Sequence, residues 1–335
     1  MSYGVFVPKV QEELNCSYST ATFIGTLHMG VCYMASPIVA VMVEAFGYRL
    51  VALVGSTGLT TALVISGFSQ SAWILALIYG GIAGLAMSML LTTSEMILNE
   101  YFDKKLSLAS ALMFSGSSFG QFAYAPFSSY ILHTFGLKEG FLAQAALTIL
   151  SIFLGITFRT PISNNSVESH EEKSTNPINI FYDSGLWKSR EFILFNIGYA
   201  FNSLSCLIPD MYIVSLLLDS EEIQVTPMDA SFAVTVLASG YIVGHLLCAV
   251  LDKYPHHCIK VIGLSSLASG VVLAILPNCS NLHFLYTLCG LFGFLSSPMV
   301  TLGPVSIKEM VGVEEYNPAL SLNMFTYGVM ILCGK

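Results

Sequence analysis

Charged residues are scarce in this sequence, and their scarcity excludes an ordinary soluble fold. Only 10% of the 335 residues are Asp, Glu, Lys or Arg, whereas 54% are hydrophobic, and the mean hydropathy is +0.71. A soluble domain carries about 25% charged residues, because its surface has to stay hydrated. The chain lacks that polar surface, and we therefore predict that lipid is its solvent.

Motifs for catalysis, metal binding and nucleic-acid binding are also missing. The sequence has no nucleophile elbow, zinc motif or phosphate loop, and no basic run that would suggest nucleic acid. Its eight cysteines show neither CxxC nor Cys/His metal spacing. We therefore expect no enzyme activity, no cofactor and no metal. A disulfide between Cys16 and Cys279, which fall in loops expected on the same outer side, stays open as an alternative.

Long apolar windows are what the sequence has in abundance. A helix needs roughly 20 apolar residues to cross a bilayer core of about 30 Å. Nine windows meet this requirement, at 21–43, 50–68, 71–98, 106–132, 140–158, 192–218, 230–251, 258–276 and 282–307. Glycine pairs four residues apart predict close helix contacts: Gly80 and Gly84, Gly116 and Gly120, Gly240 and Gly244.

Two shorter apolar segments flank the nine windows. Met1–Val7 is interpreted as the outer end of a helix whose beginning is absent. Ala319–Cys333 is interpreted as the start of a further helix that stops too early to cross without help. We therefore expect one partial and five complete helices before the linker 159–191, and four complete and one partial helix after it.

Basic residues alternate from loop to loop and set the predicted orientation. Cytoplasmic loops are enriched in Lys and Arg. Every second loop is basic, through Arg49, Lys104, Lys105, Arg159, Lys173, Lys188, Arg190, Lys253, Lys260 and Lys308. The opposite loops hold only Lys9 and Lys138. We therefore place the polar linker 159–191 in the cytoplasm as a disordered tether, and the glycosylation sequons at Asn15 and Asn278 outside.

Two loops suggest that the halves of the chain are related. The loop from Glu44 to Arg49 contains, in this order, an acid, a spacer, an aromatic residue, a turn residue and a base. The loop that begins with Asp252-Lys253-Tyr254-Pro255 has the same order of residue types at its start. Each loop follows the second helix of its half if a first helix precedes residue 21. An acid at a helix end and a base beyond the turn can pair, which would latch neighbouring helices of a carrier that rocks between two states.

The residues at two places resemble the monocarboxylate transporter family of the major facilitator superfamily. Ser19 to Gly55 is similar to that family's second helix and the loop after it. The run from Tyr101 to Gly120 resembles its signature entering helix five. The signature residues matched are Tyr101, Phe102, Lys104, Lys105, Gly116 and Gly120. Leu106 stands where the signature has a third base, and Ala45 replaces a base after helix two.

The resemblance implies an all-α polytopic membrane protein of two six-helix bundles. In that frame helix 1 is partial, helices 2 to 10 are complete, helix 11 is partial and helix 12 is absent. The domains would be an N-terminal bundle at 1–158, the linker at 159–191 and a C-terminal bundle at 192–335.

The resemblance also points to residues in the eighth helix. Proton-coupled family members are thought to use a lysine in helix one, plus an aspartate and an arginine one turn apart in helix eight. Here Tyr241 stands at the aspartate position and His245 at the arginine position, and helix one is cut at or before its lysine. His245 is our first candidate for substrate or proton contact, because an intramembrane ionisable group is costly and usually functional.

Further candidates follow from polar residues inside apolar windows. Glu95 lies one turn from the cytoplasmic end of its helix, and Asp210 follows Pro209. Each is a candidate for contact with substrate or proton, although Glu95 could equally pair with a base. Residues at helical spacing could line a cavity as neutral groups: Asn196, Tyr199 and Asn202. His28 is predicted to be a hydrogen-bonded packing residue.

Three functions stay open. The first is a secondary transporter of monocarboxylates or related organic acids that works by alternating access, with a proton as the candidate co-substrate. The second is a facilitative carrier of neutral or zwitterionic amino-acid-like solutes, favoured by the missing arginine. The third is a truncated product that does not transport. The resemblance further implies the plasma membrane and a single-span immunoglobulin-like partner.

Overall fold

The structure is a computed structural model, and it describes residues 3–102, 105–158, 185–219, 225–250, 257–279, 281–313 and 315–334. Every element within these ranges is helical. In chain order the elements are η1 (Tyr3–Val5), α1 (Val7–Glu13), α2 (Tyr18–Met34), α3 (Ser36–Phe46), α4 (Tyr48–Ser66), α5 (Ala72–Leu75), η2 (Ala76–Ala83), α6 (Gly84–Tyr101), α7 (Leu106–Thr134), α8 (Leu137–Thr157), η3 (Gly185–Lys188), α11 (Arg190–Leu218), α12 (Pro227–Cys248), α13 (Cys258–Ile275), η6 (Leu276–Asn278), α14 (Leu282–Val311) and α15 (Tyr316–Cys333).

The predicted spans all coincide with helices, but they are not all alike. Seven helices within the described ranges are long and apolar enough to cross a bilayer, and α2 with α3 makes an eighth candidate. The window at 106–132 is the exception: it forms the continuous helix α7 of 29 residues, which falls outside that set. Serine is frequent in α7 and lowers its hydropathy. Eight of the nine predicted spans therefore meet the criterion of length and hydropathy.

The helices of the structure depart from the predicted ones at three places. The window 21–43 is bent by 46° between α2 and α3, because Pro37 opens α3 and cannot continue the ladder of α2. The short helix α1 extends to Glu13, so Lys9 lies on a helix and not in a loop. The C-terminal bundle also starts slightly earlier than predicted, since α11 begins at Arg190. The rest of the predicted linker, 159–184, lies outside the described residues.

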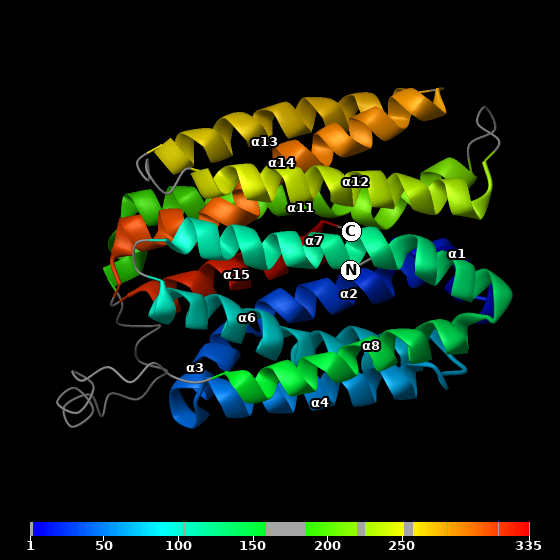
Figure 1. The fold of residues 1–335 in the computed structure, drawn as a ribbon, viewed down its shortest axis with the longest axis horizontal. Coiled ribbons are helices and arrows are strands. Elements are labelled where there is room, and N and C mark those ends of the chain that lie inside the picture. Colours follow the sequence, from blue (N-terminus) through cyan, green and yellow to red (C-terminus); the bar gives the residue numbers. More distant parts are fainter. Residues whose placement is uncertain are drawn as a thin grey trace.

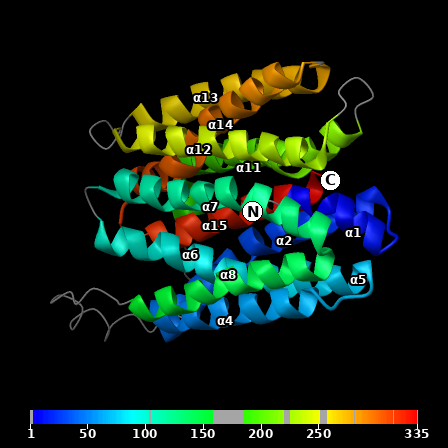
Figure 2. The same ribbon diagram turned by 45° about the vertical axis from the view of Figure 1, so that its right-hand side comes forward.

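The helices run side by side in a layered bundle (Figure 1). Helix α13 forms one edge, with α14 packed between it and α12, and α4 and α8 form the other edge. In the middle α7 packs along α12, and α2 packs along α15. Figure 2 shows the same order after a 45° turn. The two predicted halves therefore meet along the α7–α12 and α2–α15 pairs.

Burial separates the inner helices from the outer ones. In the most apolar window of α14, 67% is buried within the bundle, but only 22% is buried in α8 and in α13. The outer helices instead expose large apolar side chains: Leu150, Phe153, Leu154, Leu264 and Leu267. A soluble protein rarely exposes such contiguous apolar surface, so these faces fit hydrocarbon, as the composition predicts.

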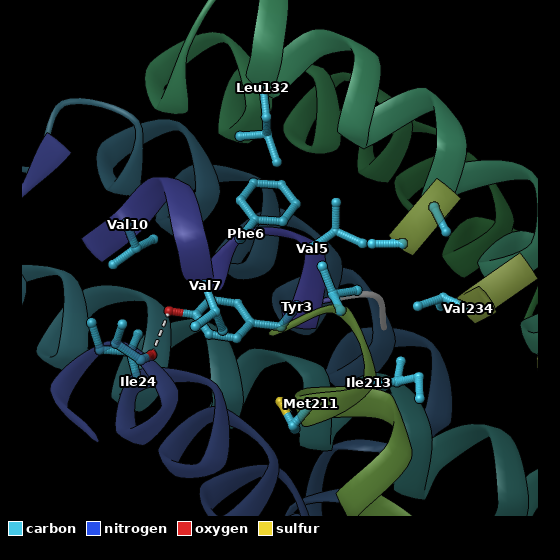
Figure 3. Packing of buried hydrophobic residues seen from close by; sticks show 14 of the residues in the cluster. Tyr3, Val5, Phe6, Val7, Val10, Ile24, Leu132, Met211, Ile213 and Val234 are labelled. Carbon is cyan, nitrogen blue, oxygen red and sulfur yellow. Dashed lines mark hydrogen bonds between the residues drawn. The ribbon is translucent and has the colours of Figure 1, made fainter. Parts of the chain in front are cut away.

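The N-terminal segment packs into the bundle as part of a large apolar core. Figure 3 shows Tyr3, Phe6 and Val7 among side chains from α2, α7, α11 and α12. The Tyr3 hydroxyl donates a hydrogen bond of 3.0 Å to the carbonyl of Ala21. The Tyr3 ring also stacks on Tyr79 with centroids 5.2 Å apart. This segment therefore ties elements of both halves together near one end of the bundle.

The glycine pairs divide into two kinds. A Cβ on Gly240 would lie 2.0 Å from the carbonyl oxygen of Gly290, and a Cβ on Gly244 would overlap Ser297. The close contact between α12 and α14 therefore requires glycine. Gly80 and Gly84 are similarly crowded by α2. The prediction was wrong for the third pair, Gly116 and Gly120, because an added Cβ would meet nothing within 4 Å at either position.

The two kinds of glycine give a matched test of stability. We expect Gly240→Ala to lower the apparent melting temperature by several degrees, because overpacking against backbone costs about 1–3 kcal/mol. Gly116→Ala should leave it unchanged or raise it slightly, since alanine favours a helix by roughly 0.5–1 kcal/mol over glycine. Differential scanning fluorimetry of the purified protein in detergent measures both. Equal shifts for the two variants would contradict the packing described here.

Glycosylation tests the predicted orientation. The sequon residues Asn15 and Asn278 are both exposed, and the α1–α2 junction and η6 lie at the same end of the bundle (Figure 1). The α3–α4, α6–α7 and α14–α15 junctions lie at the opposite end. We expect N-glycosidase to shift the protein on a gel, and Asn15→Gln and Asn278→Gln to remove the shift stepwise. Asn164, in the third sequon of the sequence, belongs to the linker that is predicted to be cytoplasmic, so Asn164→Gln is the control. A mobility shift that depends on Asn164 would reverse the predicted orientation.

Candidate functional site

A cavity of about 170 Å³ lies between the two halves. Seven helices contribute to its wall: α2, α6, α7, α11, α12, α14 and α15. A smaller cavity of about 20 Å³ adjoins it, since Tyr33, Phe114, Val300 and Tyr327 line both. We call them the large and the small cavity. Together they form one space into which a few polar and ionisable side chains are placed among apolar ones.

His245 lies in the wall of the large cavity, as the sequence led us to expect. Its side chain is 3% exposed, and its Nδ1 shares a hydrogen bond of 2.6 Å with the Thr301 hydroxyl on α14. Tyr241, one turn earlier on α12, also lines the cavity, and its ring stacks with the His245 ring at 6.0 Å. The structure therefore brings the two candidates of helix eight to one site.

Asp210 lies in the wall of the same cavity and is held from the other half. The Gln121 side-chain amide of α7 donates a hydrogen bond of 2.8 Å to Asp210 Oδ1 on α11. Because the two residues come from different halves, this bond crosses the interface at the cavity. Gln121 was not predicted, although a glutamine in the middle of the apolar window 106–132 is a signal that could have found it.

Glu95 lies in the wall of the small cavity, among aromatic rings. Its side chain is only 5% exposed, and the same cavity is lined by Tyr33, Tyr199 and Tyr327. The Tyr327 ring lies 4.7 Å from the Tyr33 ring and 5.4 Å from the Tyr199 ring. Within the described ranges, no side chain forms an ion pair or a hydrogen bond with the Glu95 carboxyl. The predicted alternative, a pair between Glu95 and a base, is therefore absent from this part of the chain.

The polar residues of α11 have different surroundings. Tyr199 lines the small cavity, as predicted. Asn196 and Asn202 line neither cavity. Asn196 accepts hydrogen bonds from Asn323 at 2.9 Å and from the Thr326 hydroxyl at 3.3 Å. The Asn202 side chain accepts one from the Cys206 thiol at 3.0 Å. The predicted neutral lining is therefore correct for one residue of the three.

His28 has the packing role that was predicted for it. Its Nδ1 shares a hydrogen bond of 2.8 Å with the Tyr79 carbonyl, and the two rings stack at 4.6 Å. It lines neither cavity. The eight cysteines are all free, so Cys16 and Cys279 form no disulfide.

The predicted helix latch is not formed by the pair of residues that the structure describes. Glu44 ends α3 and Arg49 begins α4, both are exposed, and no ion pair joins them. Both side chains reach water at the bundle end, where a lone surface pair contributes little free energy. The second half of the latch, Asp252 and Lys253, lies outside the described residues.

The family signature falls at the junction of two helices. Tyr101 is the last residue of α6, Phe102 caps it, and Lys105 precedes α7. Lys104 lies outside the described residues. This first part of the signature therefore marks a turn between helices, whereas Gly116 and Gly120 lie within α7; none of these described signature residues lines either cavity.

The cavity wall carries acids but no fixed cation. Neither cavity is lined by a lysine or arginine within the described ranges, and His245 is the single basic side chain there. In the same ranges no three His, Cys, Asp or Glu side chains come together to hold a metal ion. The chemistry available at the site is therefore hydrogen bonding, proton binding and contact with aromatic faces.

The comparisons with known proteins agree on one superfamily. Residues 1–334 match the Major Facilitator Superfamily. Monocarboxylate transporter 2 of Meriones unguiculatus is 29% identical over 228 residues, which cover 63% of this chain and 47% of that protein. Monocarboxylate transporter 4 of Gallus gallus is 23% identical over 339 residues, covering 99% of this chain and 70% of that protein. The chain thus spans about half of the first relative and 70% of the second.

A double-mutant cycle tests the contact between the halves. We expect Gln121→Ala and Asp210→Ala each to lower the apparent melting temperature, because each leaves a polar partner without its hydrogen bond. The double variant should lose less than the sum, with a coupling of about 0.5–3 kcal/mol. The control cycle combines Gln121→Ala with Asn202→Ala, which should be additive. Additivity in both cycles would show that Gln121 and Asp210 do not interact.

Proposed function

The chain belongs to the major facilitator superfamily of membrane transporters, and we propose that it carries small monocarboxylates or related organic acids through its central cavity. The observation that carries this proposal is a cavity whose wall comes from both predicted halves of an apolar helical bundle and includes the ionisable side chains of Asp210 and His245. Polar and ionisable residues inside a membrane protein are costly and mark solute pathways. The names of the two relatives support monocarboxylates as the class of solute.

Alternating access is the mechanism that this arrangement favours. The antiparallel helices α7 and α12 touch at both ends: Ser107 donates a hydrogen bond of 2.9 Å to the Cys248 carbonyl, and Ser129 donates one of 3.5 Å to the Pro227 carbonyl. The cavity lies between these two contacts. Opening one end requires breaking a neutral hydrogen bond of about 0.5–1.5 kcal/mol and some apolar packing. Two apolar clusters also join residues of both predicted halves, so opening one side would separate part of that packing as well.

A proton is the proposed co-substrate, with His245 as the residue that binds it. Histidine changes charge near physiological pH. When protonated, His245 would supply the one positive charge on the described cavity wall and could pair with a carboxylate. When neutral, it would release the anion. The Thr301 hydroxyl orients the ring through the bond at Nδ1, which leaves the Nε2 side for solute or proton.

A second candidate is a carrier of neutral or zwitterionic solutes without obligatory proton coupling. It is favoured by the absence of lysine and arginine from the described cavity wall, together with the presence of Glu95 and Asp210. A solute with its own positive charge would balance these acids. The plasma membrane and a single-span immunoglobulin-like partner stay predictions from the family.

Uptake of radiolabelled L-lactate at about pH 6.5 and 7.5 outside the cell tests the proposal. We expect cells expressing the protein to take up several-fold more at the lower pH, because an inward proton gradient drives symport. His245→Ala should remove this pH dependence. His283→Gln is the matched control, because His283 is exposed at the start of α14 and lines neither cavity.

The outcomes separate the parts of the proposal. Uptake that exceeds that of untransfected cells but ignores pH would refute proton coupling and favour the second candidate. No uptake above that background, with the protein at the cell surface, would refute L-lactate as a solute of this carrier. If His245→Ala behaves like His283→Gln, His245 has no role in coupling.

A further inference from the structure

The unpartnered acid in the small cavity points to the chemistry of the solute. Glu95 lies inside a membrane bundle, and the described residues offer its carboxyl no ion pair and no hydrogen bond. A buried carboxylate without a partner is expensive, so it is retained where a proton or a cation neutralises it. The described part of the protein supplies no such cation, since no lysine or arginine lines either cavity.

The other walls of the small cavity suit a cation from outside the protein. Three tyrosine rings surround the space beside Glu95, with Tyr327 at 4.7 Å from Tyr33 and 5.4 Å from Tyr199. Aromatic faces attract ammonium groups through the ring quadrupole, and more strongly when water is excluded. The Asn323 and Glu95 side chains add polar atoms to this aromatic wall. A carboxyl among tyrosine rings is the combination that recognises an amine.

The size of the small cavity limits the kind of amine. Its volume of about 20 Å³ is close to the roughly 10–15 Å³ that one water molecule needs by the same measure. A primary ammonium group has a similar size and fits. A trimethylammonium group is larger by three methyl groups and does not.

From this geometry we propose that the transported solute carries a primary amine, and that Glu95 binds its ammonium group within the ring cluster of Tyr33, Tyr199 and Tyr327. This inference rests on the proposed carrier function and names its substrate class: small amino acids, which are monocarboxylates with an amine. The rest of the solute would occupy the large cavity, where its carboxylate meets neutral donors such as Ser117 and Gln121 and the imidazole of His245.

The test compares two solutes that differ in one group. L-Alanine and L-lactate share a skeleton and a carboxylate, but alanine has an ammonium group where lactate has a hydroxyl. We expect cells expressing the protein to take up radiolabelled L-alanine in preference to L-lactate. Excess trimethylated alanine should not compete. Glu95→Gln, which keeps the shape and removes the charge, should lower the ratio of alanine to lactate uptake about tenfold or more.

Three further variants separate the effect of the Glu95 charge from that of the Tyr327 ring and from a folding defect. Glu100→Gln is the matched control for Glu95→Gln, because Glu100 is an exposed glutamate on the same helix. Tyr327→Phe keeps the aromatic face and should retain alanine uptake, whereas Tyr327→Leu should lower it several-fold. Lactate uptake and surface biotinylation report folding and delivery of each variant.

The outcomes distinguish this inference from the proposed function. Lactate uptake without alanine uptake overturns the amine site and leaves the carrier of organic acids intact. Uptake of neither solute overturns both. If Glu95→Gln reduces alanine and lactate uptake equally, Glu95 serves the transport cycle and not the amine, and the inference is wrong. Loss of alanine uptake alone in Glu95→Gln confirms it.

Discussion

The cost of placing polar groups inside an apolar bundle governs the organisation of this protein. Each buried polar side chain has to find a partner, because water is absent and an unmatched group is expensive. Most do so within their own helix: Ser66, Ser94 and Ser118 all donate to the carbonyl four residues earlier. His28 finds a carbonyl on a neighbouring helix. Some buried hydroxyls have no hydrogen-bond partner among the described residues: Ser88 and Thr93 line neither cavity, whereas Ser296 lines the large one.

The contacts between α12 and α14 differ in kind from the contacts that α7 makes across the interface between the predicted halves. Helices α12 and α14 approach so closely that Gly240 and Gly293 would each place a Cβ within 2.2 Å of a carbonyl oxygen of the other helix. Such backbone contact resists shear and keeps these two helices as one unit. From α7, the side chains of Ser107, Gln121 and Ser129 each donate a hydrogen bond to α12, α11 or the residues that open α12. These side-chain contacts are of the kind that the proposed movement of one half against the other would break.

Much of the fold could be predicted from the sequence, because hydropathy reports directly on the solvent. The windows located each helix, and Pro37 was visible as a residue that can bend one. Whether Gly116 and Gly120 contact another helix could not be predicted, because the sequence pattern of a glycine pair is the same when it faces a neighbouring helix and when it faces open space. The latch between Glu44 and Arg49 failed for a related reason: the order of residues fixes their sequence separation but not whether two exposed side chains meet.

The candidate site was predicted in part, and the residues that were missed are those whose role depends on which helices pack together. His245, Tyr241, Asp210, Glu95 and Tyr199 stood out as polar groups in apolar helices, and all five line the cavities. Asn202 had the same signal, yet it lines neither cavity and accepts a hydrogen bond from Cys206 instead. Tyr33 and Tyr327 gave no signal, because an aromatic residue in an apolar window is ordinary. Their meaning comes only from their place beside Glu95, since a carboxyl alone is compatible with a proton, but a carboxyl within a tyrosine cluster also favours an ammonium group.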